Sequence, residues 1–330
     1  MNNRRKLIIA LGASALTAPF GSISQQQGKV WRIGFLGSEN ENASVYRMRV
    51  EGFRAGLRDF GYEEGKNIVI EFRWAEGKND RLPELAAELV RLKVDVLVTH
   101  ATPPTRAIKQ ATTTIPIVIA TIADPVALGL VASLARPGGN ITGSTFFPAE
   151  LAAKRIEVLK DAFPRITQVA VLADQENAAT RQMYLQAMEA TARSVKVTLH
   201  EYPVRGPHEF DSAFAAMVKK RVGAVAVPEN PIFIANAKAI ADLAEKQRLP
   251  LIGNGEIAEA GGVIGYGANL VELFRRVGYF VDKILKGTNP GSIPIEQPTR
   301  FELVINMKTS KAIGIRFPQT FLQRADKVIE

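Results

Sequence analysis

Val94-Asp95-Val96-Leu97-Val98-Thr99-His100-Ala101-Thr102-Pro103 contains the pattern that decides the fold of this chain. Its apolar half is typical of a strand buried in a sheet, and its polar half ends in a proline that suits the start of a helix. We expect four further strands to run into polar loops in the same way, at residues 31–35, 117–121, 169–172 and 224–227. The carboxyl ends of parallel strands meet at one edge of a sheet, and α/β proteins bind their ligands there.

Strand and helix patterns alternate along most of the chain, which predicts an α/β fold with mostly parallel sheets covered by helices on both faces. The pattern restarts near residue 149, after a short strand at residues 140–145. We therefore expect two doubly wound parallel-sheet lobes joined by a hinge. Closure of the same alternation into a single barrel of eight units is the alternative. The predicted helices include residues 125–135 and 231–247, and a helical end is predicted near residues 318–328.

The first residues of the chain have the composition of an export signal. Three basic residues at positions 4–6 precede an apolar stretch at residues 7–20, and the small residues at positions 22 and 24 fit a small-x-small cleavage site before Gln25. The apolar stretch is too short to span a bilayer comfortably, so a membrane anchor is the weaker alternative. We expect a signal peptide at residues 1–24 and export by the general or the twin-arginine route.

Cysteine usage and charge narrow the class of protein. The chain has no cysteine, so an exported form has neither disulfides nor a lipid-attachment site, and we expect a free protein of the periplasm. Loss of the three basic residues of the signal lowers the net charge from +9 to +6. The remaining basic residues are scattered along the chain and form no nucleic-acid-reading module, so no nucleic-acid partner is expected.

Polar residues that follow the predicted strands of the first lobe are candidates for ligand binding. Ser38 and Glu39 lie in the loop after the first strand, which is the commonest ligand loop of doubly wound folds. His100 and Thr102 follow the third strand, where the start of a helix attracts a carboxylate or phosphate. Thr102 either takes part in such a site or only caps the helix, since both roles use the same geometry.

The other candidates carry similar alternatives. Asp124 either caps a helix or accepts a hydrogen bond from a ligand ammonium group, and Trp74 either stacks on a ligand or packs against a helix. Phe146 and Phe147 either form a wall of the cleft or fill the joint between the lobes. The complete set of predicted ligand-binding residues is Ser38, Glu39, Trp74, His100, Thr102, Asp124, Asp174, Glu176, Glu229, Asn230, Asn254 and Tyr266.

Motifs of catalysis are weak in this chain. The absence of cysteine excludes thiol nucleophiles and zinc–thiolate sites, and the three histidines lack the spacing of metal ligands. No Gly-x-Ser-x-Gly elbow, Gly-rich dinucleotide fingerprint or Walker-type phosphate loop occurs. We therefore predict no catalytic residue, no metal site and no cofactor.

Several segments resemble one bacterial family, the ABC-transporter substrate-binding proteins whose best-known branch binds tryptophan and related aromatic amino acids. The most specific is Leu130-Val131-Ala132-Ser133-Leu134-Ala135-Arg136-Pro137-Gly138-Gly139-Asn140-Ile141-Thr142-Gly143. The other resembling segments span nearly the whole mature chain and lie at residues 33–36, 81–83, 86–90, 113–118, 123–126, 283–287, 296–299 and 301–306.

The resemblance implies a type I periplasmic-binding fold, the Venus-flytrap architecture, in which the chain crosses the hinge three times and a solute binds between the lobes. It places the N-terminal lobe at residues 30–145 plus about 268–297, and the C-terminal lobe at residues 146–267 plus about 298–330. It also implies delivery of a small solute to an inner-membrane ABC permease, which works with an ATPase. We expect the protein to be a monomer.

The solute itself is less defined by the sequence. The resemblance implies an amino acid, aromatic in the best-known branch, or another small carboxylate. Tryptophan-type members hold the ligand carboxylate with small hydroxyl residues after the third strand, and Thr102 is the candidate for that role here. The loop His100-Ala101-Thr102-Pro103-Pro104 departs from them, because it replaces the glycine-containing loop expected at this place. The alternative function is a small-molecule sensor module, or an α/β enzyme that acts on a small carboxylate with His100 as its base.

Overall fold

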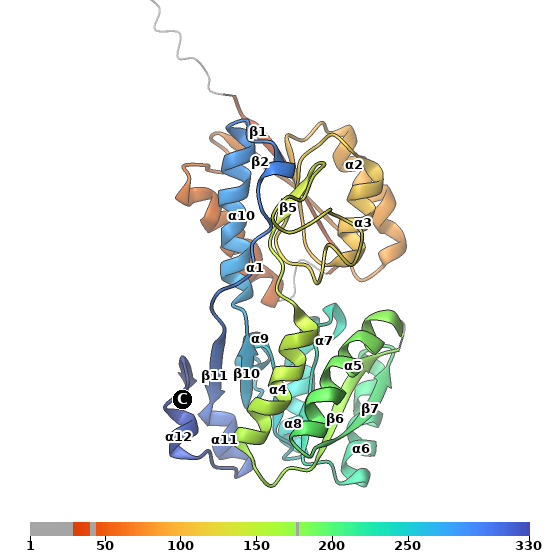
Figure 1. Cartoon of the computed structure of the whole chain (residues 1–330), viewed down its shortest axis with the longest axis vertical. Coiled ribbons are helices and arrows are strands. Elements are labelled where there is room, and N and C mark those ends of the chain that lie inside the picture. The colour runs from red at the N-terminus through yellow and green to blue at the C-terminus, as the bar shows by residue number, and fades with distance from the viewer. Residues whose placement is uncertain (1–28, 40–43, 176–177) are drawn as a thin grey trace, which may run out of the picture. The chain divides into compact units, whose positions relative to one another are not determined.

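The computed structural model describes residues 29–39, 44–175 and 178–330 of the chain (Figure 1). Two expectations lie outside these residues, namely the signal peptide at residues 1–24 and the ligand-binding role of Glu176. Trp31–Glu330 forms one compact unit that contains two β-sheets. Two separate sheets rule out the single barrel and confirm the α/β class.

The first sheet is wholly parallel, and its strands in the described chain follow the order β2-β1-β3-β4-β5. These strands are β1 (Trp31–Gly37), β2 (Ile68–Trp74), β3 (Val96–Thr99), β4 (Ile117–Ile119) and β5 (Ile141–Gly143). Ile33 of β1 pairs with Ile70 on one side and with Val96 on the other, which makes β1 an inner strand. Inner strands of parallel sheets are apolar on both faces because helices cover both.

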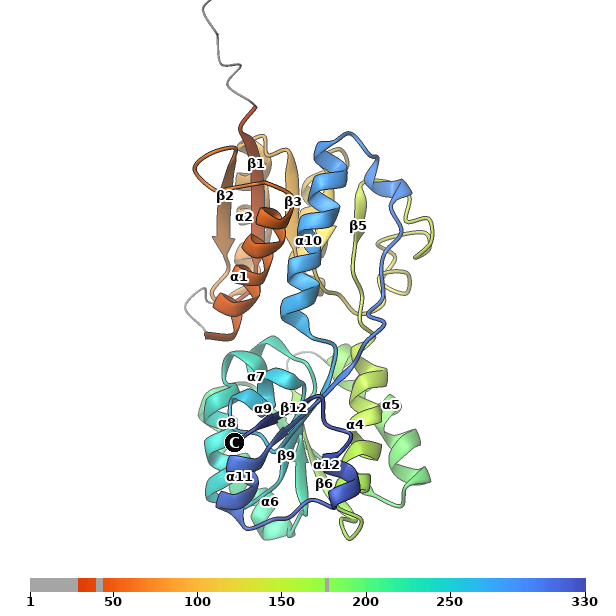
Figure 2. The same cartoon turned by 90° about the vertical axis from the view of Figure 1, so that its left-hand side faces the viewer.

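Two layers of helices cover this sheet. Helices α1 (Ser44–Asp59) and α10 (Leu270–Leu285) lie side by side on one face, and α2 (Leu82–Arg91) and α3 (Thr102–Ala111) cover the other (Figures 1 and 2). Glycines allow α1 and α10 to approach closely. A Cβ atom at Gly56 would overlap the backbone oxygen of Arg275, and one at Gly278 would overlap the backbone of Gly56.

The second sheet follows the order β12-β11-β10-β9-β8-β6-β7 in the described chain. Strand β11 pairs antiparallel with β10, and the other pairs are parallel. The strands are β6 (Gln168–Asp174), β7 (Thr198–Val204), β8 (Ala224–Ala226), β9 (Leu251–Gly253), β10 (Ile264–Gly267), β11 (Glu302–Asn306) and β12 (Lys327–Ile329).

Helices also cover both faces of the second sheet. One face packs against α4 (Pro148–Ala162), α5 (Ala178–Ser194), α11 (Met307–Ile313) and α12 (Gln319–Leu322). The other packs against α6 (Phe210–Lys220), α7 (Pro231–Ala235), α8 (Ala237–Lys246) and α9 (Gly255–Glu259). Three short 3₁₀ turns complete the described elements, at Asn79–Arg81, Pro207–Glu209 and Pro290–Ser292.

The chain passes between the two sheets three times: from β5 to α4, from β10 to α10, and from the turn at Pro290–Ser292 to β11. Two doubly wound lobes joined by a hinge therefore describe the fold. The residue boundaries of the lobes stay a prediction. Among the described residues, no helix is both long enough and apolar enough to cross a membrane.

Three predicted helices were wrong in detail. Residues 125–135 form turns, because Asp124 Oδ1 accepts hydrogen bonds from two successive backbone N–H groups and Gly129 adopts a positive φ of 67° that interrupts helical geometry. The helix predicted at residues 231–247 is divided into α7 and α8 at Asn236, which has φ −112° and ψ 20°. The predicted helical end near 318–328 contains only α12, followed by β12.

Candidate ligand site

Each lobe has a topological switch point, the place where neighbouring strands continue to opposite sides and leave a crevice at the carboxyl edge. In the first sheet it lies between β1 and β3, and in the second between β6 and β8. Several predicted residues end or follow these four strands: Ser38, Glu39, His100, Asp174, Glu229 and Asn230. The fold therefore places half of the predicted set at the two positions where ligands bind in sheets of this kind.

At the first switch point, Glu39 and His100 come together. The Oε2 atom of Glu39 lies 3.1 Å from Nε2 of His100, and their side chains are 1% and 2% exposed. Among the described residues, neither carboxylate oxygen of Glu39 has a hydrogen-bond partner, and the same holds for Ser38 Oγ. The imidazole packs among the rings of Tyr46 and Phe274, at centroid distances of 5.7 and 5.2 Å.

Glu39 is ionised in this environment. Burial by itself raises the pKa of the carboxyl group, but the neighbouring His100 and the Arg49 guanidinium outweigh it and hold the pKa of Glu39 below its ordinary value. Burial, reinforced by the charge of Glu39, raises the pKa of the Tyr46 hydroxyl, so this phenol stays neutral. The first switch point thus presents an anionic carboxylate beside a neutral hydroxyl.

An ion pair between the lobes completes this cluster. Arg49 of α1 donates from Nε to Oε1 of Glu256 at 2.7 Å, and a second guanidinium nitrogen donates to Oε2. Asn254, a predicted site residue, caps α9 and donates to the same Glu256 at 3.1 Å. The Arg49 guanidinium lies over Tyr46, 4.8 Å from the ring centroid. Despite burial, Glu256 and its neighbours raise the pKa of Arg49 above its ordinary value.

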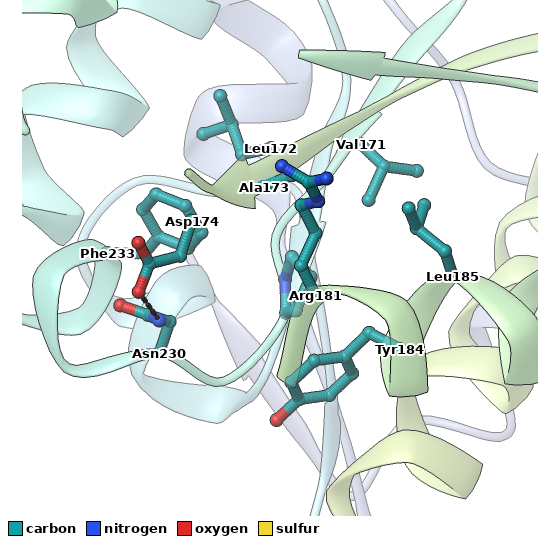
Figure 3. Close-up of a pocket in the computed structure, with 10 residues that line it drawn as sticks. Val171, Leu172, Ala173, Asp174, Arg181, Tyr184, Leu185, Asn230 and Phe233 are labelled. Carbon is teal, nitrogen blue, oxygen red and sulfur yellow. Dashed lines mark hydrogen bonds between the residues drawn. The ribbon is translucent and has the colours of Figure 1, made fainter. Parts of the chain in front are cut away.

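At the second switch point, Asp174 and Asn230 come together (Figure 3). The Asn230 side chain donates to Asp174 Oδ2 at 2.9 Å and accepts from the N–H of Ile232, which caps α7. Arg181 and Tyr184 of α5 line the same hollow. The free volume of the hollow is about 10 Å³, which is room for about one water molecule.

Glu229 has a structural partner. Its carboxylate forms a two-point ion pair with Arg155, which is 1% exposed and also donates from Nε to the backbone oxygen of Tyr266 at 2.7 Å. Tyr184 donates from its hydroxyl to the Glu229 backbone oxygen at 2.8 Å. The ring of Tyr266 stacks with Phe301 at 6.4 Å. Glu229 and Tyr266 thus hold the second switch point in shape.

The remaining predicted residues lie against other rings of the sheet, in a turn, or at the start of a helix. Trp74 stacks with Phe72, with ring centroids 6.1 Å apart and ring planes 4° apart, and also packs against Phe35. Asp124 accepts two hydrogen bonds within its own turn. Thr102 does not cap α3, because it is the first residue of this helix; the cap position belongs to Ala101, which adopts a positive φ of 62°.

The aromatic pair after β5 lines a pocket at the joint between the lobes. Phe146 packs into a small apolar cluster with Leu151 and Leu270, which is the joint-filling alternative. Phe147 borders a pocket of about 230 Å³, together with Gln297 and other residues of two hinge crossings. This pocket is larger than the hollow at the second switch point.

Sequence reasoning missed four charged or polar residues of the site: Tyr46, Arg49, Arg155 and Glu256. Tyr46 fitted the apolar face of α1, and Arg49 fitted a solvated one. Arg49 and Glu256 are 207 residues apart, so no local pattern links them. Within the described residues, no three His, Asp or Glu side chains come close enough to hold a metal ion.

Two doubly wound lobes with polar side chains at both switch points define the class of type I periplasmic binding proteins. Residues 41–329 match the model of the ABC transporter substrate binding protein family, so the chain belongs to that family.

Individual relatives agree with this assignment. The chain is 26% identical to the tyrosine-binding protein of Clostridioides difficile (strain R20291) over 267 residues, which are 81% of this chain and 76% of the relative. A structure from Streptococcus pneumonia, an ABC domain in complex with L-Trp, matches with a TM-score of 0.81 at 25% identity, covering 91% of this chain and 99% of the other. A conserved domain protein from Vibrio cholerae matches with a TM-score of 0.83 at 25% identity over 91% and 100%.

Proposed function

We propose that this chain is the solute-binding component of an ABC importer, which captures a small solute between its lobes and delivers it to an inner-membrane permease and its ATPase. The observation that carries the proposal is the presence of a polar cluster at the switch point of each lobe, in a chain of this family. A solute bound between the lobes contacts both clusters, and hinge motion encloses it.

The proposed solute is an amino acid, aromatic in our leading version, or another small carboxylate. A relative is named for tyrosine, and another was solved with L-Trp. Tyr46, Trp74 and Tyr184 supply aromatic rings near the two switch points. Aromatic side chains offer both stacking surface and apolar area to an aromatic solute.

We propose that residues 1–24 are a signal peptide and that the mature chain is a monomer of the periplasm without metal, cofactor or nucleic-acid partner. The composition of residues 1–24 and the absence of cysteine support export of a chain without disulfides. Expression with the native N-terminus, followed by cell fractionation and N-terminal sequencing, tests the cleavage before Gln25. A chain that stays in the cytoplasm with residues 1–24 attached contradicts this part of the proposal.

We also propose that the chain is not an enzyme. The alternative assigns a catalytic base to His100, the histidine at the carboxyl edge of the first sheet. Its Nε2 faces the buried Glu39, and no nucleophile hydrogen-bonds to it among the described residues. Turnover of a bound solute that disappears in His100→Ala favours the enzyme over the receptor.

Native mass spectrometry of the protein purified from its own periplasm tests the function most economically. We expect one retained small molecule per chain, with the mass of an amino acid or small carboxylate. Melting shifts with a panel of amino acids, aromatic acids and small carboxylates provide the second arm. The proposal fails when no solute is retained and none of the panel raises the melting temperature.

A further inference from the structure

The central acid of the cluster at the first switch point has His100 Nε2 within 3.1 Å but makes no completed side-chain hydrogen bond among the described residues. Glu39 is buried and ionised, and both of its carboxylate oxygens and the Ser38 hydroxyl lack hydrogen-bond partners among the described residues. A buried carboxylate without donors is costly, since such groups in proteins are nearly always paired and hydrogen-bonded. An unfilled set of three oxygen atoms at a switch point indicates that something else supplies the donors.

The charges around Glu39 indicate the kind of donor. The titratable and charged groups beside Glu39 are His100 from the loop after β3 and Tyr46 and Arg49 from α1. Glu256 of α9 pairs with Arg49. Arg49 is already committed to Glu256 by two hydrogen bonds. The two carboxylates of the cluster, Glu39 and Glu256, therefore share a single guanidinium, that of Arg49. A cationic donor would complete both the charge and the hydrogen bonding.

Aromatic rings beside the carboxylate favour an ammonium group as this donor. A Cβ at Gly37 would overlap the indole of Trp74 and lie 3.3 Å from Glu39 Oε2, so the indole and the carboxylate flank the same glycine. Tyr46 lies nearby and packs against His100. A carboxylate with adjacent aromatic surface binds ammonium by ion pairing and cation–π attraction together.

We propose that Ser38 and Glu39 form the ammonium subsite of this protein, and that they select amino acids over carboxylates that lack an amine. The inference rests on the proposed function, because it names which solutes the same site accepts. The Glu39 carboxylate and the Ser38 hydroxyl accept hydrogen bonds from the protonated amine of the solute. A solute that carries only a carboxylate meets the negative charge of Glu39 at this end of the site and is disfavoured.

Access to this subsite depends on separation of the lobes. Glu256 belongs to the second lobe and is joined to Arg49 of the first, so the cluster is shared by both. Burial strengthens the subsite once the solute is enclosed, because charges interact more strongly away from water. Ser38 and Glu39 thus provide the polar end of the site, whereas the aromatic rings contact the rest of the solute.

Paired solutes that differ only in the amine provide the test. L-tryptophan is compared with 3-(indol-3-yl)propionate, and L-tyrosine with 3-(4-hydroxyphenyl)propionate, by isothermal titration calorimetry on the mature chain. We expect each amino acid to bind about ten- to a hundredfold more tightly than its partner, since hydrogen bonds to a charged group contribute on that scale. In Glu39→Gln the ratio of the two affinities within each pair of solutes falls towards one. In Ser38→Ala the same ratio falls by a smaller factor.

Glu88→Gln is the matched control. Glu88 lies on α2 of the same lobe and is 34% exposed in an ion pair with Arg73, so its loss removes a carboxylate outside the cluster and leaves the ratio unchanged. The ratio of two affinities measured on one variant is insensitive to loss of folded protein. The subsite is overturned if a folded Glu39→Gln protein keeps the wild-type ratio of affinities for the amino acid and its partner without the amine. It is also overturned if that ratio is near one in the wild type. Either result leaves the receptor function standing.

Solutes retained through purification cover the remaining outcome. If none of the four compounds binds the wild-type protein, a retained solute that bears an amine supports the subsite, provided that Glu39→Gln loses it. A retained solute without a basic nitrogen overturns the subsite. Absence of both binding and retained solute overturns the proposed function, and the subsite with it.

Discussion

The ion pair between Arg49 and Glu256 is the contact between the lobes that a mutation removes most cleanly. Their side chains are 5% and 8% exposed, and two hydrogen bonds join them. Replacement of Arg49 by Met leaves the Glu256 carboxylate buried with Asn254 as its remaining donor. We expect the free energy of unfolding to fall by about 3–5 kcal/mol, the usual cost of breaking a buried pair by removing one partner.

The structure also predicts strong coupling between the two positions. Replacement of both residues, in Arg49→Met with Glu256→Leu, removes both buried charges and leaves apolar side chains of similar size. The double variant should therefore lose about 2–3 kcal/mol less than the sum of the two single variants. The exposed pair Arg58–Glu51 on the same helix α1 is the matched control, with side chains 52% and 58% exposed. Its loss should cost no more than about 1 kcal/mol.

The free energy of unfolding is measured in guanidinium for four proteins: the wild type, Arg49→Met, Glu256→Leu and the double variant. Fluorescence of Trp31 and Trp74 reports the first lobe, because both tryptophans lie on its sheet, and far-ultraviolet circular dichroism reports the whole chain. If the two single losses simply add in the double variant, the pair does not couple the lobes and the reasoning is refuted.

Three further predictions concern packing, capping and pH. Gly56→Ala places a methyl group against the backbone oxygen of Arg275, so the free energy of unfolding measured with denaturant should fall by about 1–3 kcal/mol. A change near zero would argue against the close packing of α1 and α10. Asn230→Ala removes the cap of α7 and the hydrogen bond to Asp174, so the free energy of unfolding should fall by about 1–2 kcal/mol and solute binding should weaken. Unchanged solute affinity would show that Asn230 is not part of the ligand site. Because the pKa of Glu39 is lower in the folded protein, its ionised carboxylate stabilises the fold above the unfolded value of about 4.3, and this stability is lost as the pH falls through the folded-state pKa. The melting temperatures of wild type and Glu39→Gln should therefore converge at acid pH, and a gap that widens there contradicts the assignment.

Local patterns predicted the fold well because each strand and most helices have their own periodicity. The stretch from Val94 to Pro103 forms β3 and the start of α3 as expected. The helix predicted at residues 125–135 failed because Asp124 and Gly129 favour turns that apolar spacing does not reveal. The predicted cap of α3, Thr102, is the first residue of the helix, and the cap position is one residue earlier, at Ala101. Ala101 adopts a backbone conformation that is uncommon for alanine, so the sequence did not indicate it.

The candidate site was predictable only where it follows strand ends. Ser38, Glu39 and His100 lie at the carboxyl ends of β1 and β3, and strand order alone brings them together. The partners that decide their chemistry come from distant elements. Arg49 lies on a helix face whose burial depends on the second lobe, and Glu256 lies on a short helix without a sequence signal.

A crystal structure of the mature chain with L-tryptophan or L-tyrosine tests the central claim most directly. We predict one solute between the lobes, with its amine at Ser38 and Glu39 and its other end facing the switch point formed by Asp174 and Asn230. Electron density for the solute in the pocket beside Phe147 instead, or no bound solute at saturating concentration, would contradict it.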